Sequence, residues 1–154
     1  MKIRTTLLTL AMCFVAIAVA FAEDANMGTW KLNEANSKFA AGATKNSTVV
    51  YEAAGDNVKV TVDGTDKDGK PAHNEWTGKF DGKDYPVTGD PNTDARAYKK
   101  INDRTLGLTG KKDGKVVTTG RIAVSVDGKT RTVNVSATDS AGKNIKSTAV
   151  YDKQ

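Results

Sequence analysis

Four Asp-Gly-Lys sequences divide this chain into short runs in which apolar and polar residues alternate. They begin at Asp68, Asp81, Asp113 and Asp127. Asp-Gly between two alternating runs is a strong hairpin signal, because both central residues of the favoured two-residue turn have positive φ. The pattern therefore predicts antiparallel strands joined by tight turns, with the same turn chemistry repeated along one domain and no duplicated unit.

About ten strand-like runs can be read in this way. They cover residues 29–33, 47–54, 58–64, 72–80, 85–88, 95–101, 104–109, 115–126, 129–138 and 144–151. The alternation is typical of antiparallel strands with one face packed inward and the other in water. Closing such a sheet into a barrel removes its exposed edges. We therefore expect an all-β fold, an antiparallel up-and-down meander of about 8–10 strands that closes into a barrel. A curved open sheet and a two-sheet sandwich are the alternatives.

One segment interrupts the alternation near the start of the meander. Residues 34–39 favour one short helical turn, and the Ala-Ala-Gly-Ala sequence at 40–43 favours a flexible connection. The segment has room for a short lid over one end of a barrel. It is too short for two full helices.

The first 22 residues read as a secretory signal peptide. Lys2 and Arg4 precede an apolar run over 7–19, and Ala20-Phe21-Ala22 provides a small-x-small cleavage site. The run is shorter than the roughly 20 residues of a transmembrane helix. We expect cleavage near Ala22, a periplasmic or secreted protein without a stable membrane anchor, and a single β-barrel domain over 23–154.

The cysteine content supports a core-stabilised domain. Cys13 is the only cysteine, and it lies within the predicted signal peptide, so the mature chain has no disulfide. A lipidated Cys13 is an alternative, but Met12 occupies a position where a lipobox has a small residue, and the apolar run continues beyond it. About 130 residues are enough for one hydrophobic core.

The first predicted strand carries a family resemblance. Gly28-Thr29-Trp30-Lys31-Leu32 resembles the opening of the calycins, which include lipocalins and fatty-acid-binding proteins. The mature chain is also similar to small exported bacterial lipocalin-like proteins. The resemblance implies a β-barrel in which the Gly-x-Trp indole lies across the closed end and a small, largely apolar ligand binds inside.

The last predicted strand departs from the fatty-acid-binding pattern. That branch has an Arg-x-Tyr pair that binds the lipid carboxylate, whereas here Ala149 precedes Tyr151 in the arginine position. The resemblance thus implies a neutral or differently held ligand. We assign Trp30, Trp76 and Tyr151 as candidate ligand-binding residues, with the alternative that both tryptophans only fill the core.

Metal and catalytic sites have little support in the sequence. His73 and Glu75 could supply two ligands of a metal site, but a stable site needs three or four. The spacing from Gly64 to Glu75 is close to that of a calcium loop, and a β-hairpin turn explains the same residues. Glu52 is a further strand carboxylate that could act with Glu75 or His73 in an enzyme. We predict no catalytic residue, no metal and no cofactor.

Charge gives no indication of a nucleic-acid partner. The net charge is +5, with lysines spread along the chain, and the single run Arg96-x-Tyr98-x-Lys100 stands alone. We therefore expect a non-enzymatic exported barrel that binds a small hydrophobic ligand. The alternative is an envelope protein-interaction or inhibitor-type module with a filled core. The oligomeric state cannot be read from the sequence.

Overall fold

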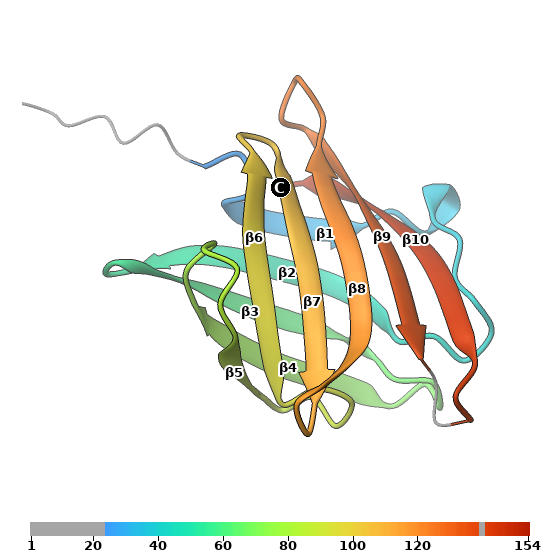
Figure 1. Cartoon of the computed structure of the whole chain (residues 1–154). Helices are drawn as coiled ribbons and strands as arrows, with labels where there is room; N and C mark the ends of the chain where they lie inside the picture. Colours follow the sequence, from blue (N-terminus) through green and yellow to red (C-terminus); the bar gives the residue numbers. More distant parts are fainter. Residues whose placement is uncertain (1–23, 139–140) are drawn as a thin grey trace, which may run out of the picture.

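The computed structural model describes residues 24–138 and 141–154, which form an antiparallel barrel of ten strands (Figure 1). The strands are β1 (Gly28–Leu32), β2 (Lys45–Ala54), β3 (Asn57–Thr65), β4 (Pro71–Gly78), β5 (Tyr85–Thr88), β6 (Ala95–Asn102), β7 (Thr105–Lys112), β8 (Lys115–Val124), β9 (Thr130–Thr138) and β10 (Asn144–Lys153). Each strand pairs with its neighbours in the chain, so the predicted meander is confirmed. The predicted signal peptide lies outside the described residues.

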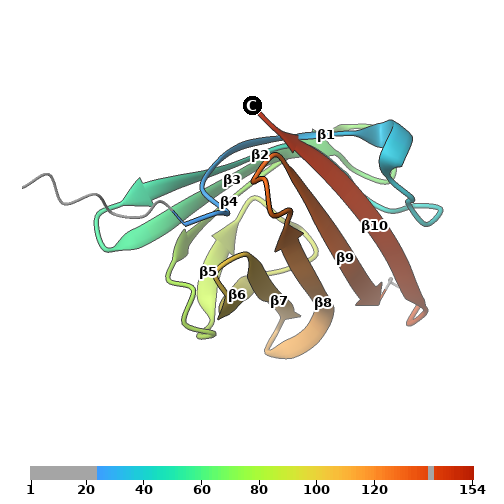
Figure 2. The same cartoon turned by 90° about the horizontal axis from the view of Figure 1, so that it is seen from above.

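The barrel closes through pairing between its first and last strands. Trp30 of β1 is opposite Lys153 of β10 on one side and Val49 of β2 on the other. This ring leaves no open edge, which confirms the barrel and rules out the open sheet and the sandwich. In two views, β1–β4 form one wall and β6–β9 a second wall that crosses it at a steep angle (Figures 1 and 2).

The Asp-Gly turns lie between strands as predicted, but only one of them has the predicted backbone. Asp113 is the one non-glycine residue with positive φ among the described residues, at 49°, and Gly114 follows at 76°. In the β8–β9 turn only Gly128 has positive φ, because the Asp127 carboxylate accepts the amide of Lys129 at 3.0 Å. The side chain thus stabilises an Asx-type turn in place of a second left-handed residue.

The segment between β1 and β2 contains the expected single helical turn. It is a 3₁₀ helix at Glu34–Asn36, and the side chain of Asn33 accepts the amide of Asn36. The chain then returns to the barrel wall, where Lys38 and Thr148 of β10 exchange two backbone hydrogen bonds of 2.7 and 2.8 Å. Within the described residues, no helix is long and apolar enough to cross a membrane.

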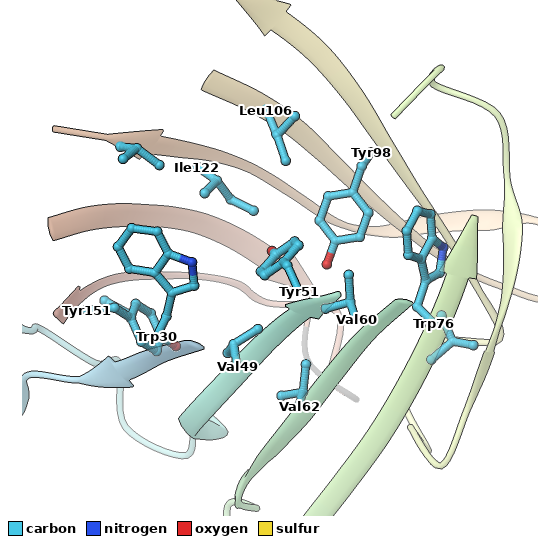
Figure 3. Packing of buried hydrophobic residues seen from close by; sticks show 13 residues of the cluster. Trp30, Val49, Tyr51, Val60, Val62, Trp76, Tyr98, Leu106, Ile122 and Tyr151 are labelled. Atoms are coloured by element: carbon cyan, nitrogen blue, oxygen red, sulfur yellow. The ribbon is translucent and has the colours of Figure 1, made fainter. Parts of the chain in front are cut away.

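The inward positions of the strands form the core. Its buried apolar members come from every strand except β9, and they include Trp30, Val49, Tyr51, Val60, Trp76, Tyr98, Leu106, Ile122 and Tyr151 (Figure 3). The predicted alternation of Ile122 and Val124 is confirmed. Its extension to Val126 is wrong, because β8 ends at Val124 and Val126 lies exposed in the following turn.

Candidate ligand site at the open end of the barrel

The two ends of the barrel differ in how tightly they are packed. In an up-and-down meander, successive turns lie at opposite ends, so the turns at 55–56, 79–84, 103–104 and 125–129 share one end. The segments at 33–44, 66–70, 89–94 and 113–114 share the other. We call the first the sealed end and the second the open end.

At the sealed end an arginine fills the space between aromatic rings. The guanidinium carbon of Arg131 lies 5.0 Å from the ring centres of Trp30 and Tyr51 and 4.8 Å from that of Tyr151. Arg131 is only 2% exposed, and Trp30 is fully buried, with its indole N–H donating to the carbonyl of Asn26 at 2.8 Å. Cation–π contacts and close packing therefore close this end to solvent.

A second aromatic cluster crosses the middle of the barrel. Trp76 stacks on Phe80 and meets Tyr85 and Tyr98 edge to face, with ring centres 4.8 Å apart in the pair with Tyr98. Tyr51 joins this cluster through Tyr98 at 6.2 Å (Figure 3). Burial, with Tyr98 adding to it and Arg131 opposing it, raises the pKa of Tyr51. This part of the interior is thus dry and densely filled.

Toward the open end, several inward-facing side chains are partly exposed. Ladder pairs place Gly110 opposite Thr118, Thr118 opposite Ala137, and Ala137 opposite Ile145, and all these positions face inward. Thr118, Ala137 and Ile145 are half-buried, although the barrel wall covers them from outside. The inward face is therefore less completely buried here than at the sealed end.

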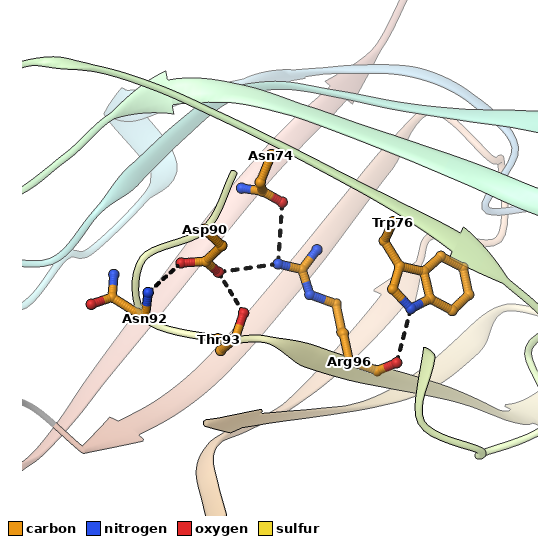
Figure 4. A network of polar contacts seen from close by, with 6 residues as sticks. All are labelled: Asn74, Trp76, Asp90, Asn92, Thr93 and Arg96. Atoms are coloured by element: carbon orange, nitrogen blue, oxygen red, sulfur yellow. Dashed lines mark hydrogen bonds and ion pairs between the residues drawn. The ribbon is translucent and has the colours of Figure 1, made fainter. Parts of the chain in front are cut away.

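A polar cluster lies on the inner wall at this end (Figure 4). Nη2 of Arg96 lies 3.2 Å from the side-chain oxygen of Asn74 and 3.4 Å from a carboxylate oxygen of Asp90. Asp90, in the β5–β6 loop, also accepts the hydroxyl of Thr93 at 2.6 Å and the amide of Asn92 at 2.8 Å. The Arg96 and Asp90 side chains are only 11% and 16% exposed.

The structure separates the three residues that the sequence singled out. Trp30 and Tyr151 both contact Arg131 at the sealed end, whereas Trp76 belongs to the central cluster. All three are buried. That they contact a ligand remains a prediction, and Trp76 is the nearest of them to the polar cluster, because its indole N–H donates to the carbonyl of Arg96 at 2.8 Å.

Sequence reasoning missed Arg131, and it considered Arg96 only as part of a possible nucleic-acid-binding run. Arg96 alternates with Tyr98 on one face of β6, and Arg131 alternates with Val133 on one face of β9. This period-2 spacing was the available signal, because it assigns each arginine to the same side as a buried residue. In β10 the position two residues before Tyr151 is Ala149, and the residue directly opposite Tyr151 is Arg131 of β9.

The residues considered for catalysis lie on the outside. Nδ1 of His73 donates a hydrogen bond to the carboxylate of Asp63 at 2.7 Å, and Glu75 forms an ion pair with Lys59 at 2.8 Å. The side chains of His73 and Glu75 are 54% and 40% exposed, and Glu52 faces outward on β2. In residues 24–138 and 141–154, no group of three His, Cys, Asp or Glu residues is placed to hold a metal ion.

Comparisons with known proteins find likeness in three dimensions only. No family model matches the chain, and no curated protein matches it. Among solved structures, the chain is similar to a redesigned β-barrel, mFAP1, bound to DFHBI, with a TM-score of 0.48 and 17% identity over 84% of this chain and 95% of that one. EF1p2_mFAP2b bound to DFHBI is similar at a TM-score of 0.48 and 13% identity, over 84% and 94% of the two chains.

Proposed function

We propose that this protein is an exported, non-enzymatic carrier that binds a small, largely apolar ligand inside its barrel through the open end. The observation that carries the proposal is the contrast between the two ends. Arg131 and Tyr151 at the sealed end are almost fully buried. At the open end, the inward residues Thr118, Ala137 and Ile145 are partly exposed. A concave, mostly apolar interior with a few polar groups is typical of small-molecule sites.

Other features of the chain support this proposal. The Gly-x-Trp strand resembles that of the calycins, and Trp30 lies at the sealed end, where that resemblance implied it. The strand carboxylates and His73, which an enzyme of this kind would need in a cleft, face outward and are solvated. The signal-peptide pattern supports export to the periplasm or beyond.

A second candidate function is a protein-interaction module with a filled core. The observation in its favour is the central cluster of Trp76, Phe80 and Tyr98, which occupies much of the interior. In addition, a shallow concavity of about 270 Å³ lies on the outer face of β6 and β7, next to the half-exposed Ile101. This module would bind its partner outside the barrel and leave the open end unused.

A pair of adjacent threonines distinguishes the two functions. Thr118 faces into the open end, and Thr119 faces outward and is exposed. The neutral dye N-phenyl-1-naphthylamine is titrated into the mature protein and its fluorescence is followed. We expect saturable binding that Thr118→Trp abolishes by filling the open end and that Thr119→Trp leaves unchanged.

The result that would overturn the carrier proposal is equally specific. It is an absence of saturable binding by the wild type, both for this dye and for a panel of fatty alcohols and acids examined by native mass spectrometry. Dye binding that is equally affected by Thr118→Trp and Thr119→Trp would place the dye outside the barrel and support the interaction module.

A further inference from the structure

One tetrapeptide, Lys-Asp-Gly-Lys, occurs twice in the chain and adopts two different backbone conformations. It spans residues 67–70 between β3 and β4, and residues 112–115 between β7 and β8. In the first copy only Gly69 has positive φ, whereas in the second both Asp113 and Gly114 have it. Because the local sequence is the same, a chemical difference between the two turns must come from the structure around them.

An Asp-Gly bond can rearrange without an enzyme or a cofactor. The glycine amide nitrogen attacks the side-chain carboxyl carbon of the aspartate, one water leaves, and a five-membered succinimide forms. Hydrolysis at the former main-chain carbonyl returns the water and gives isoaspartate, whose backbone runs through the side-chain carbonyl. Glycine favours this reaction because it has no Cβ to obstruct the ring. The reaction needs a free glycine N–H and a protonated carboxyl group that can turn toward it.

The glycine nitrogen is engaged in three of the four Asp-Gly turns. In these turns its N–H donates a backbone hydrogen bond, from Gly69 to Asp66 at 3.1 Å, from Gly82 to Tyr98 at 2.8 Å and from Gly128 to Ser125 at 3.0 Å. The turn at 113–114 differs because Lys112 and Lys115 pair directly across it, which leaves the central N–H outside the ladder. Within residues 24–138 and 141–154, the Gly114 N–H donates no hydrogen bond.

The carboxylates of the same three turns are also held by neighbouring donors. Asp68 is bound by Nζ of Lys67, Asp81 by the amide of Lys83 and the hydroxyl of Tyr85, and Asp127 by the hydroxyl of Ser125 and the amide of Lys129. The Lys83 amide lowers the pKa of Asp81, and the Ser125 hydroxyl lowers that of Asp127. These two aspartates therefore contain less of the protonated acid that reacts.

A fifth Asp-Gly pair lies inside a strand, where the backbone is fixed on both sides. Gly64 of β3 is opposite Asn46 of β2 and Ala72 of β4. The carboxylate of Asp63 accepts the hydrogen bond from His73 at 2.7 Å. Ring closure here would break the pairing of a central strand, so this pair is protected by the fold.

We propose that Asp113-Gly114 is a site of spontaneous isoaspartate formation, at which the β7–β8 hairpin changes its backbone as the folded protein ages. In the part of the chain that the structure describes, no hydrogen bond or ion pair reaches the Asp113 carboxylate, and its amide donates to Asp94 at 2.8 Å. A Cβ built on Gly114 would meet no atom within 4 Å, which leaves space for the ring.

The product keeps the negative charge and lengthens the main chain by one methylene group. The length of a two-residue turn fixes the register of its hairpin, so the added atom alters the turn at the open end. The sealed end lies at the opposite end of the barrel and stays unchanged. This inference does not depend on the proposed carrier function.

Ageing of the folded mature protein tests the site, with the copy of the tetrapeptide at 67–70 as the matched control. The protein is kept for several weeks at mildly acidic pH and physiological temperature. Its peptides are then analysed by electron-transfer mass spectrometry, which distinguishes isoaspartate from aspartate by the fragments of the rearranged backbone. We expect isoaspartate to form at Asp113 at least about tenfold faster than at Asp68, Asp81 or Asp127.

The same measurement in concentrated urea removes the hydrogen bonds and keeps the sequence. There the rates at Asp68 and Asp113 should agree within about twofold, because only the local sequence remains to set them. If Asp113 reacts no faster than Asp68 in the folded protein, the site is wrong. If Asp113 keeps its full advantage in urea, the fold is not the cause and the inference is likewise overturned.

Discussion

Arg131 and Tyr151 are directly opposite residues of β9 and β10, and the guanidinium carbon lies 4.8 Å from the centre of the phenol ring. Burial raises the pKa of Tyr151 to about 12, although the positive charge of Arg131 opposes the rise. Tyr51, which contacts the same arginine, has a pKa that is raised in the same direction. The sealed end thus holds its phenols in the neutral form well into the alkaline range.

This arrangement predicts a loss of stability at alkaline pH. A phenol of the unfolded chain ionises near pH 10, and that of Tyr151 in the folded barrel near 12. Below about pH 10 both states are neutral and stability is unaffected. Between about 10 and 12 the unfolded state releases its proton first, so stability falls by up to about 1.4 kcal/mol per pH unit for each such tyrosine.

Denaturant unfolding at a series of pH values measures this loss, and phenolate absorbance follows ionisation directly. Tyr151→Phe should make the free energy of unfolding fall less steeply with pH in this range. The expected reduction in slope corresponds to one fewer proton released on unfolding. A wild type whose phenolate absorbance rises in step with that of the denatured chain would contradict the prediction.

Two strand glycines should respond in opposite ways to an added methyl group. A Cβ at Gly78 would lie 2.5 Å from Cγ of Tyr85 and 2.7 Å from the Trp76 ring, so Gly78→Ala should lower the free energy of unfolding by about 1–3 kcal/mol. At Gly107 the nearest atom, on Ile101, would be 3.6 Å away, an ordinary contact. Gly107→Ala should be neutral or slightly stabilising, because it restricts the unfolded chain.

Urea unfolding of the two variants and the wild type provides the comparison. Equal losses in both variants would mean that any side chain is harmful in these strands, and that the contact between Gly78 and Tyr85 is not the reason.

The single histidine should titrate above its ordinary pKa of 6.5. The hydrogen bond with Asp63 is the main cause, and nearby carboxylates, including Glu75, add to it, so the pKa of His73 is raised. Nuclear magnetic resonance of the imidazole protons measures this value without interference, since the chain has only one histidine. Asp63→Asn should lower the midpoint, and Glu75→Gln should lower it less.

The raised pKa of His73 also predicts how the stability of the fold changes with pH. A raised folded-state pKa favours the folded protein below pH 6.5, and this contribution disappears as the pH rises through the folded-state value. Asp68→Asn, a change in a turn that His73 does not contact, serves as the control. A midpoint that moves equally in Asp63→Asn and Asp68→Asn would show a general charge effect and contradict the specific contact.

Both tryptophans should be shielded from quenchers in the folded protein. Trp30 is fully buried and Trp76 is 1% exposed. Acrylamide should therefore quench native fluorescence far less than that of the unfolded chain. Trp76→Phe isolates the signal of Trp30, which should stay protected because its ring is fully buried and packs against Arg131. Quenching of Trp30 that equals the unfolded value would show that the end we call sealed is open.

Most of the fold could be predicted from the sequence because its signals are local. The alternation of Val58, Val60 and Val62 and the glycine turns assign strands and faces with a period of two residues. Turn conformation was less predictable. The carboxylates of Asp81 and Asp127 accept nearby backbone amides, which gives tight turns without a left-handed aspartate.

The candidate site was less predictable because it depends on pairing between distant segments. Asn74, Asp90 and Arg96 belong to β4, a loop and β6, and the register of the short β5 brings them together. Likewise, a search for an arginine within β10 could not find Arg131, which reaches Tyr151 from the neighbouring strand. Residue spacing identifies the face on which a side chain lies, but not which partner stands across from it.

The seam between β1 and β10 has a consequence for how the chain acquires its structure. Trp30 and Lys153 are paired neighbours, so the ring is incomplete until almost the whole polypeptide is present. Contacts of such long sequence separation are entropically costly and form slowly. Until that seam forms, the meander is an open sheet with two unprotected edges, a state prone to aggregation. A chain exported before folding would therefore complete this step on the far side of the membrane.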